Sequence, residues 1–508
     1  MKKLKRKSNE KKVIHLIILS LITAFVCFEI YTKVFFGNES VDEFYFYITH
    51  GAKNGDLGMY WNGIKFSIPV FICLMALVYA VFYNVLVKKS IYVSIKGKRH
   101  KLYPFDIVIN HKRFFTCLYA ILSLVAAVYN YRITRFFASN IIKSTFIEDN
   151  YVMDKDDIKF NKKRNLIYIV VESLETTLFT KAQGGAWDHE VIPELYDLLN
   201  DSDTYYFSGN SKAGGLINQY GGSWTTSAII SNNTGLPLKV HLSKTQYQKN
   251  NYMNGAYALG DLLKDNGYYN EVITAARANF GGIEEFYTQH GNYNIVDIST
   301  LKSLGYDYEE SDLGVWGFND KYLFEVSKKR VEEAAKKNQP FNIEMITIDT
   351  HPNDGFVGDY TVNKFDEQFD NVYATTSSLL AEFVNWVKAQ EFYKDTTIVI
   401  VGDHLNMQTD YFKGRDTNRY IFNAFINPAV KPIKTKNRKA MAIDMYPSTV
   451  AAIGGEIGSN KLGLGTNLFS DEETLAEEYG VEELNNQLSK KSEFYNIKIL
   501  GLKPSKDK

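Results

Sequence analysis

Three long apolar segments in the first third of the chain place the strongest constraint on its fold. They cover residues 13–30, 66–87 and 114–131, and each is close to the ~20 residues needed to cross the hydrocarbon core of a bilayer. The first follows a basic N-terminus. Its apolar run is longer than that of a signal peptide, no small-residue cleavage site follows it, and two further segments come after it. We therefore expect a membrane domain of three transmembrane helices over residues 1–131.

The distribution of basic residues predicts how these segments are oriented. Lysines and arginines crowd the N-terminus and residues 88–113, whereas residues 31–65 mix basic with acidic side chains. Because basic flanks stay on the cytoplasmic side, three spans place everything after Tyr131 outside the cytoplasm. We therefore expect a multi-pass plasma-membrane protein whose C-terminal part is extracytoplasmic.

Charge and cysteine content exclude several classes of function. The chain has 58 basic and 58 acidic residues, and this balance gives no support for a nucleic-acid partner. Its three cysteines, Cys27, Cys73 and Cys117, all fall within the apolar segments. The rest of the chain therefore has no cysteine for a disulfide, a thiolate zinc site or a cysteine nucleophile. Any metal there must be held by oxygen and imidazole ligands.

Residues 132–160 are predicted to connect the membrane segments to a soluble domain over residues 161–508. Within residues 132–146, apolar side chains recur near helical spacing beside basic ones. This pattern fits an amphipathic helix on the membrane surface, and a linker helix packed on the soluble domain explains it as well. The acidic residues 148–157 are interpreted as a hinge.

Beyond this linker, strands and helices alternate. Residues 166–171 form a continuous apolar run, which is typical of a parallel strand buried on both sides. The alternation predicts an α/β fold in which a mostly parallel sheet carries helices on both faces. Residues 208–223 read as a Gly- and Ser-rich loop, and the Lys-rich tail from Lys503 is expected to fray. Further strands are predicted at residues 269–274, 341–348 and 396–401, and helices at residues 192–200, 225–231, 256–266, 320–338 and 370–390.

Three of the predicted strands end in polar residues. Glu172 follows one, Asp349 and His351 follow another, and Asp403 with His404 follows the last. Because ligands bind at the carboxyl ends of strands in open α/β sheets, we expect these side chains at one edge. Carboxylates and imidazole without sulfur suit a divalent ion such as Mn, Mg or Zn. Taken singly, each acid fits a helix cap equally well, and only their joint placement favours a metal site.

A fourth element is the stretch GGSWTTSAIISNNTGLPL at residues 221–238. A Gly-Gly-Ser turn leads into Trp224 and Thr225, and an apolar helix follows. A hydroxyl in the first turn of a helix lies among unpaired backbone N–H groups, which favour an anion such as phosphate. A metal touching this hydroxyl would ease the loss of its proton and provide an alkoxide nucleophile. The structural alternative makes Thr225 an N-cap and Trp224 a core residue, and position alone leaves Ser223, Thr225 and Thr226 as candidate hydroxyls.

Seven separated motifs follow one another over residues 165–447: IYIVVESLE, GGSWTTSAIISNNTGLPL, LGDLLKDNGY, NFGGIEEFYTQHG, WGFND, TIDTHP and VGDH. In identity and order they resemble those of the phosphoglycerol transferases that decorate periplasmic glucans. These belong with lipoteichoic acid synthases in the alkaline phosphatase and sulfatase superfamily. The resemblance implies a sulfatase-like, alkaline phosphatase-like fold and a location in the bacterial plasma membrane.

Matched position by position, the resemblance implies a role for each site residue. Glu172, Asp403 and His404 look like metal ligands, and Thr225 looks like the nucleophile that also binds the metal. His351 looks like the residue that contacts the transferred phosphate. Lipoteichoic acid synthases hold a manganese ion, so the resemblance implies Mn here, with Mg and Zn as alternatives.

One stretch departs from the family pattern. Where lipoteichoic acid synthases carry a Phe-Trp-Asn-Arg stretch that helps to bind glycerol phosphate, this chain has FGGI at residues 280–283, so that arginine is missing. We interpret Arg277 as a substitute, with an ordinary surface arginine as the alternative. Trp224, beside the nucleophile, is also predicted to contact substrate.

The resemblance implies transfer of glycerol phosphate from phosphatidylglycerol in the membrane to a cell-surface polysaccharide or glycolipid, through a phosphothreonine at Thr225. A phosphoethanolamine transferase of the same superfamily is an alternative, although those enzymes are stapled by disulfides for which this chain lacks cysteines. A catalytically silent sensor or scaffold is a second alternative, and the intact ligand set argues against it. Sulfatases that use a formylglycine nucleophile are set aside, because they need a C/S-x-P-x-R motif and the soluble part has no cysteine.

Overall fold

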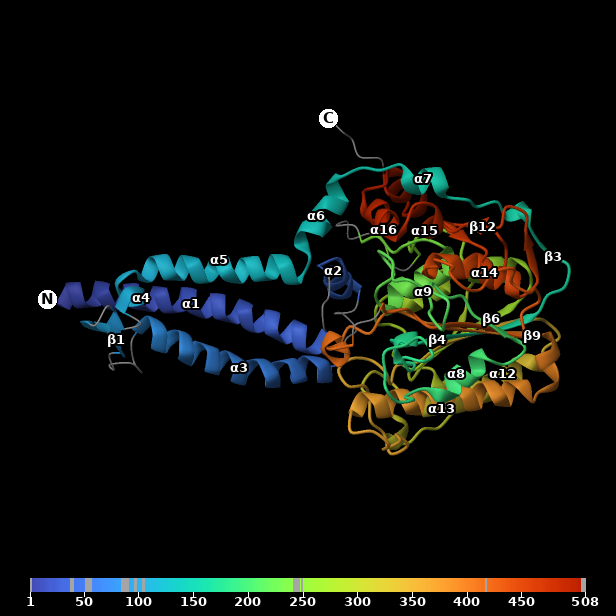
Figure 1. Ribbon diagram of the computed structural model, residues 1–508, viewed down its shortest axis with the longest axis horizontal. Coiled ribbons are helices and arrows are strands. Elements are labelled where there is room, and N and C mark those ends of the chain that lie inside the picture. Colours follow the sequence, from blue (N-terminus) through green and yellow to red (C-terminus); the bar gives the residue numbers. More distant parts are fainter. Residues whose placement is uncertain are drawn as a thin grey trace. The chain divides into compact units, whose positions relative to one another are not determined.

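The structure is a computed structural model of the 508-residue chain. It describes residues 2–36, 41–50, 57–83, 91–95, 98–102, 106–240, 247, 250–415 and 418–503. The chain divides into two compact units, shown in Figure 1. One consists of Met1–Val41 and Gly55–Phe136, and the other of Asp42–Asn54 and Phe137–Lys508. All but the first residue of the tail that was predicted to fray lies outside the described residues.

The first unit contains three helices long and apolar enough to cross a membrane. They are Asn9–Val34 within α1 (Lys2–Phe36), Gly63–Tyr83 within α3 (Leu57–Tyr83), and Lys112–Asn130, which is α5. The three apolar segments predicted from the sequence are therefore helical, except that residues 84–87 lie outside the described part. Between α3 and α5 come an antiparallel pair, β1 (Ile91–Ile95) with β2 (Lys98–Leu102), and the short α4 (Asp106–Asn110).

Two short helices replace the single amphipathic helix expected after the third span. They are α6 (Ile133–Ile141) and α7 (Phe146–Asn150). The chain turns between them, where the Ser144 N–H donates to the Lys491 carbonyl at 2.9 Å. Phe146 and Ile147 are buried in the core of the second unit, so apolar side chains anchor the chain just before residues 148–157, the segment interpreted as a hinge.

A seven-stranded mixed sheet forms the centre of the second unit (Figure 1). Its strand order is β5-β10-β9-β4-β8-β6-β7, with parallel pairing from β9 to β7 and antiparallel pairing of β10 and β5 at one edge. The expected mostly parallel sheet is confirmed. Three of its strands, β5, β7 and β10, were not predicted from the sequence. The strands are β4 (Asn165–Val171), β5 (Thr204–Tyr205), β6 (Tyr269–Thr274), β7 (Asn294–Val296), β8 (Phe341–Ile346), β9 (Thr396–Gly402) and β10 (Asn423–Ile426).

β4 lies in the middle of the sheet because its side chains are apolar on both faces. Leu166, Tyr168 and Val170 enter one core, and the alternating residues Ile167 and Ile169 enter the other. A strand buried in this way needs helices on both sides. Helices α8 (Pro193–Leu199), α12 (Asp320–Ala335) and α13 (Gln368–Lys388) supply one core, and α9 (Thr225–Thr234), α10 (Leu259–Asp265), α11 (Ile283–Gln289) and α14 (Met445–Ala452) supply the other. All five helices predicted for this domain are present, with ends shifted by at most three residues.

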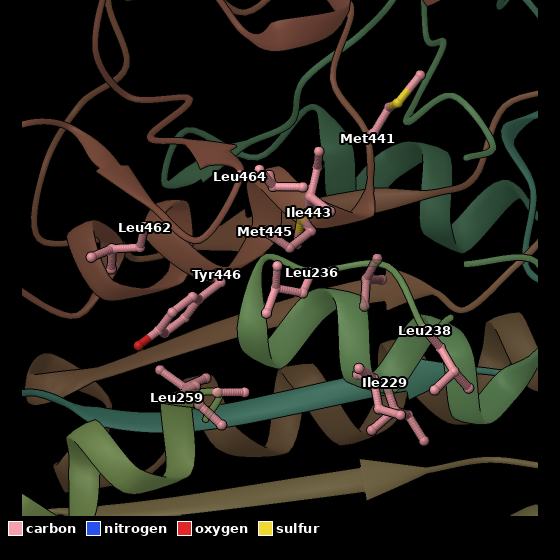
Figure 2. Close-up of a cluster of buried hydrophobic side chains, with 14 of the residues drawn as sticks. Ile229, Leu236, Leu238, Leu259, Met441, Ile443, Met445, Tyr446, Leu462 and Leu464 are labelled. Carbon is pink, nitrogen blue, oxygen red and sulfur yellow. The ribbon is translucent and has the colours of Figure 1, made fainter. Parts of the chain in front are cut away.

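The core around α9 joins it to segments far along the chain. Figure 2 shows Ile229 of α9 in one cluster with Ile443, Met445 and Tyr446, and each of these side chains is at most 1% exposed. Leu236 and Leu462, also buried, extend the same cluster. The helix that begins at Thr225 is therefore held by the C-terminal part of the domain.

Three further helices and four short strands of the described residues also belong to this part of the structure. β3 pairs with β11, and β12 pairs with β13, both antiparallel. These elements are α2 (Val41–His50), β3 (Ile158–Phe160), β11 (Gly455–Ile457), β12 (Lys461–Leu462), β13 (Gly465–Thr466), α15 (Leu475–Glu478) and α16 (Val481–Ser489).

Candidate active site

Three neighbouring strands bring the predicted metal ligands together. Glu172 follows β4 and Asp403 with His404 follows β9, its parallel neighbour, while His351 lies beyond the end of β8. One potential ligand atom from each of Glu172, Asp403 and His404 lies within 4.8 Å of the others. All three side chains are 1% exposed. The convergence expected from the strand ends is therefore present in the folded chain.

The hydrogen bonds of this cluster leave atoms free for a cation. Asp403 Oδ1 accepts the N–H groups of Ser173 and His404, both at 2.7 Å. Asp403 Oδ2 is buried and has no hydrogen-bond partner among the described residues. His404 Nδ1 lies 2.9 Å from the Leu405 carbonyl, which fixes the proton on that nitrogen. In the neutral ring, Nε2 therefore carries the lone pair, 3.3 Å from Asp403 Oδ2 and 3.5 Å from Glu172 Oε1.

The electrostatics of the cluster also fit a divalent cation. Burial, followed by repulsion from Glu172, raises the pKa of Asp403 to about 7. Burial lowers the pKa of His404, but the neighbouring Asp403 and Glu172 carboxylates outweigh it and raise that pKa above its usual value. Two adjacent buried carboxylates need a counter-charge. Oxygen and imidazole donors of this kind suit Mn, Mg or Zn.

Thr225 places a hydroxyl against this cluster. Its Oγ1 donates to Glu172 Oε2 at 3.2 Å, and the residue is partly exposed. Thr225 is also the first residue of α9, a helix of ten residues, so unpaired backbone N–H groups lie around it. One residue thus combines a hydroxyl, a predicted metal ligand and an anion-favouring helix end.

The neighbouring hydroxyls have other partners. Thr226 is buried, and its hydroxyl donates to the Gly281 carbonyl at 3.0 Å. The helix start is capped by Ser227, whose Oγ accepts the Trp224 N–H at 3.1 Å. The N-cap residue of α9 is Trp224, so the alternative that made Thr225 the N-cap is wrong. Geometry favours Thr225 among the three candidate hydroxyls.

His351 is partly buried beside the cluster. Its Nδ1 lies 2.6 Å from the Pro352 carbonyl, and its ring packs against Trp316 with centroids 5.4 Å apart. Burial lowers the pKa of His351 to about 4, so the ring is neutral at pH 7. With the proton held on Nδ1, Nε2 presents a lone pair.

Trp224 and Arg277, the other residues predicted to contact substrate, differ in solvent exposure. Trp224 is 1% exposed and belongs to the apolar core. Arg277 is exposed, and its backbone N–H donates to the Trp316 carbonyl at 3.1 Å. Substrate contact by Trp224 and Arg277 stays a prediction.

Asp349, which also follows a strand end, lies outside the ligand cluster of the described residues. Its Oδ2 accepts the Asp320 N–H at 3.1 Å and the Tyr360 hydroxyl. The Asp320 carboxylate in turn accepts the backbone N–H groups of Ile348 and Asp349. Burial raises the pKa of Asp349 to about 6. This pair braces the segment that carries His351.

Sequence reasoning missed the groups that support the ligands. Ser173 has a φ of +53°, which is uncommon for a residue with a side chain, and its hydroxyl donates to Glu172 Oε1 at 2.7 Å. Glu175 is fully buried, accepts the Asn406 N–H at 2.7 Å and pairs with Arg419. Both acidic residues of the ESLE motif therefore act at the site, but nothing local in the sequence pointed to Arg419.

A comparison with protein families identifies the chain. The family model named Sulfatase matches residues 164–452, which is more than half of the 508-residue chain. The chain belongs to the sulfatase family. This confirms the superfamily expected from the motifs.

Among curated proteins, this sulfatase-family chain is similar to phosphoglycerol transferase I of Escherichia coli O6:K15:H31 (29% identical over 322 residues) and of Salmonella choleraesuis (30% identical over 322 residues). Each alignment covers 61% of this chain and 39% of the relative. The chain thus spans about two fifths of the length of these relatives. Among solved structures, the lipoteichoic acid synthase LtaP of Listeria monocytogenes aligns with a TM-score of 0.48 and 20% identity, covering 65% of this chain and 81% of LtaP.

Proposed function

We propose that this protein is a metal-dependent phosphoglycerol transferase of the bacterial plasma membrane. It would move glycerol phosphate from phosphatidylglycerol to a hydroxyl of a cell-surface polysaccharide or glycolipid. The observation that carries this proposal is the Thr225 hydroxyl, which donates to Glu172 at the start of α9 beside a cluster of buried ligand-type groups. The similarity to relatives named phosphoglycerol transferase I supports the choice of substrate class.

Glu172, Thr225, Asp403 and His404 are the residues that would hold the metal. When bound, the cation supplies positive charge that lowers the pKa of a coordinated hydroxyl and neutralises phosphate oxygens. We propose Mn for this site, with Mg and Zn as the alternatives that metal analysis of the purified protein would distinguish.

In the first half-reaction, Thr225 Oγ1 attacks the donor phosphorus. Its proton leaves through Glu172 Oε2, which already accepts it in a hydrogen bond. The bond between phosphorus and the diacylglycerol oxygen breaks, and that oxygen takes up the proton received by Glu172, so that diacylglycerol departs as a neutral alcohol. The backbone N–H groups at the start of α9 stabilise the phosphate charge. Glycerol phosphate is then carried on Thr225 as a phosphodiester.

In the second half-reaction, an acceptor hydroxyl attacks the same phosphorus and the Thr225 oxygen leaves. His351 Nε2 carries a lone pair and is suited to receive the proton of the attacking hydroxyl, because its other nitrogen donates to the Pro352 carbonyl. The departing Thr225 oxygen takes up the proton held by His351, and both residues return to their starting states. The first step thus uses the hydrogen bond from Thr225 to Glu172, and the second uses the tautomer of His351 that the Pro352 carbonyl favours.

A donor-only incubation tests this proposal. Full-length protein in vesicles of phosphatidylglycerol should release diacylglycerol, and mass spectrometry should find glycerol phosphate on the peptide that contains Thr225. Thr225→Ala should abolish both signals. Ser223→Ala is the matched control, because its hydroxyl is two residues away, and it should keep them.

The donor head group is tested in the same assay. Vesicles of phosphatidylethanolamine should give no turnover. Turnover of that lipid in place of phosphatidylglycerol would make the protein a phosphoethanolamine transferase. An adduct on any residue other than Thr225 would overturn the mechanism.

A further inference from the structure

One helix of the catalytic unit comes from a distant part of the sequence. α2 (Val41–His50) lies in the chain between the first two apolar helices, yet Asp42–Asn54 belongs to the second unit with Phe137–Lys508. Phe46 of this helix is 0% exposed and is part of the core of that unit. Tyr45 and Tyr47 pack against the same core. Figure 1 shows α2 beside α9.

Phe46 contacts the residue that precedes the nucleophile. Its ring lies 6.4 Å from the Trp224 ring and 5.6 Å, edge to face, from the Tyr247 ring. Trp224 is the N-cap residue of α9, and its indole is buried. Because both rings are buried and lie side by side, Phe46 packs α2 against the residue immediately before Thr225.

Tyr47 acts on the other side of the nucleophile through the loop at residues 280–281. Its ring stacks on Phe280, with centroids 5.4 Å apart and an interplanar angle of 19°. Gly281 has a φ of +66°, and a Cβ added there would lie 2.9 Å from Thr226 Oγ1 and 3.5 Å from Tyr47. The Gly281 carbonyl accepts the Thr226 hydroxyl at 3.0 Å. Tyr47 thus supports the backbone to which the residue after Thr225 is bound.

The same row of rings reaches the histidine of the site. Phe280 contacts Trp316 with centroids 5.8 Å apart, and Trp316 contacts His351 at 5.4 Å. From α2, contacts therefore lead to both neighbours of Thr225 and to His351.

We propose that Phe46 and Tyr47 are positioning residues for Thr225. The helix α2, which lies in the sequence between the first two apolar helices, would thus be needed for catalysis. This inference rests on the proposed phosphoglycerol transfer. Trp224 and Thr226 flank the nucleophile, and α2 holds the first directly and the second through Phe280 and Gly281. Since a displacement of about 1 Å at a reacting group costs on the order of 100-fold in rate, loosening either contact should slow the chemical step.

The test compares ring deletions in the full-length protein, assayed by diacylglycerol release from phosphatidylglycerol vesicles. Tyr47→Ala should lower kcat by about 10- to 100-fold and leave KM within about twofold, because the substrate-binding groups stay in place. Tyr47→Phe keeps the stacked ring, so its kcat should be close to that of wild type and not to that of Tyr47→Ala. In a Phe280→Ala background, Tyr47→Ala should cost little more, since the two rings act as a pair.

Tyr129→Ala is the control, because it removes an aromatic ring that is 84% exposed and belongs to the first unit. It should keep wild-type kcat. If Tyr47→Ala fails to accumulate, Tyr47→Leu keeps most of the volume without the stacking and should show the same loss of kcat.

Hydrogen exchange of the peptide spanning residues 220–230 provides a readout that does not depend on the reaction. Tyr47→Ala should speed exchange in this peptide, and Tyr129→Ala should not. Unchanged exchange, an unchanged kcat, or a rise in KM alone would each overturn the positioning role. A wild-type protein that releases no diacylglycerol would instead contradict the proposed function, while the exchange experiment would still decide the role of α2.

Discussion

At the residue scale, the two carboxylate oxygens of Asp403 differ in their hydrogen bonding. Oδ1 accepts two backbone N–H groups, and this holds the loop after β9 in place. Oδ2 lies buried without a hydrogen bond among the described residues, 3.3 Å from His404 Nε2. Oδ1 therefore stabilises the backbone around the site, and Oδ2 is available to bind a cation.

This division predicts the effect of Asp403→Asn. The amide keeps an acceptor for the two backbone donors, so the metal-free variant should melt no lower than wild type. Loss of the anionic ligand should weaken metal binding by more than about 100-fold, because even outer-shell changes cost 10- to 100-fold. Calorimetric titration with Mn and melting curves with and without metal measure both quantities. A variant that binds Mn as tightly as wild type would contradict the assignment of this ligand.

At the scale of elements, the buried carboxylate of Glu175 connects the loop after β4 to the loop after β9 by a hydrogen bond. Glu175 lies in the first loop, is 0% exposed, and accepts the Asn406 N–H from the second. Arg419 supplies the counter-charge through its Nε at 3.0 Å and through Nη2. The ligands Glu172 and His404 thus stand on loops that are joined to each other by Glu175.

Arg419→Met should destabilise the catalytic unit strongly. It leaves the Glu175 carboxylate buried without a counter-charge, which costs about 3–5 kcal/mol of unfolding free energy. Urea unfolding of the purified protein measures this loss. Adding Glu175→Gln should recover part of it, because the unpaired charge is then gone.

Lys181→Met is the matched control, since its ion pair with Asp188 joins side chains that are 63% and 80% exposed. Its unfolding midpoint should equal that of wild type. Equal midpoints for Arg419→Met and Lys181→Met would show that the Glu175 pair does not stabilise the fold.

At the scale of the whole molecule, the chain joins three apolar helices to a catalytic unit. The basic N-terminus and the basic residues between the second and third apolar helices predict that both stay in the cytoplasm. Three crossings would then place the catalytic unit outside the cytoplasm, on the same side as the proposed cell-surface acceptor.

Cysteine labelling tests this orientation, because all three native cysteines lie in the apolar helices. A membrane-impermeant maleimide should label Asp471→Cys in intact cells, since Asp471 is exposed on the catalytic unit. Lys5→Cys, which precedes the first span (Asn9–Val34), should be labelled only after the cells are permeabilised. The reverse pattern would remove the lipid donor mechanism, because the site would face the cytoplasm.

The sequence by itself determined the features that depend on local pattern. The apolar segments and the strand at residues 165–171 were predictable because burial on all sides requires an uninterrupted apolar run. The convergence of Glu172, Asp403 and His404 was predictable because parallel strands end at one edge of a sheet, which brings residues at their ends together.

Tertiary structure alone decided the features that depend on distant partners. Short strands such as β5 and β10 have too few residues for a periodic signal, and they exist because neighbours pair with them. The choice of Thr225 over Thr226 depends on Gly281, more than fifty residues away, which takes the second hydroxyl. The assignment of α2 to the catalytic unit follows from stacking on Phe280. A local pattern cannot encode such contacts, because their energy comes from groups that only the folded chain brings within reach.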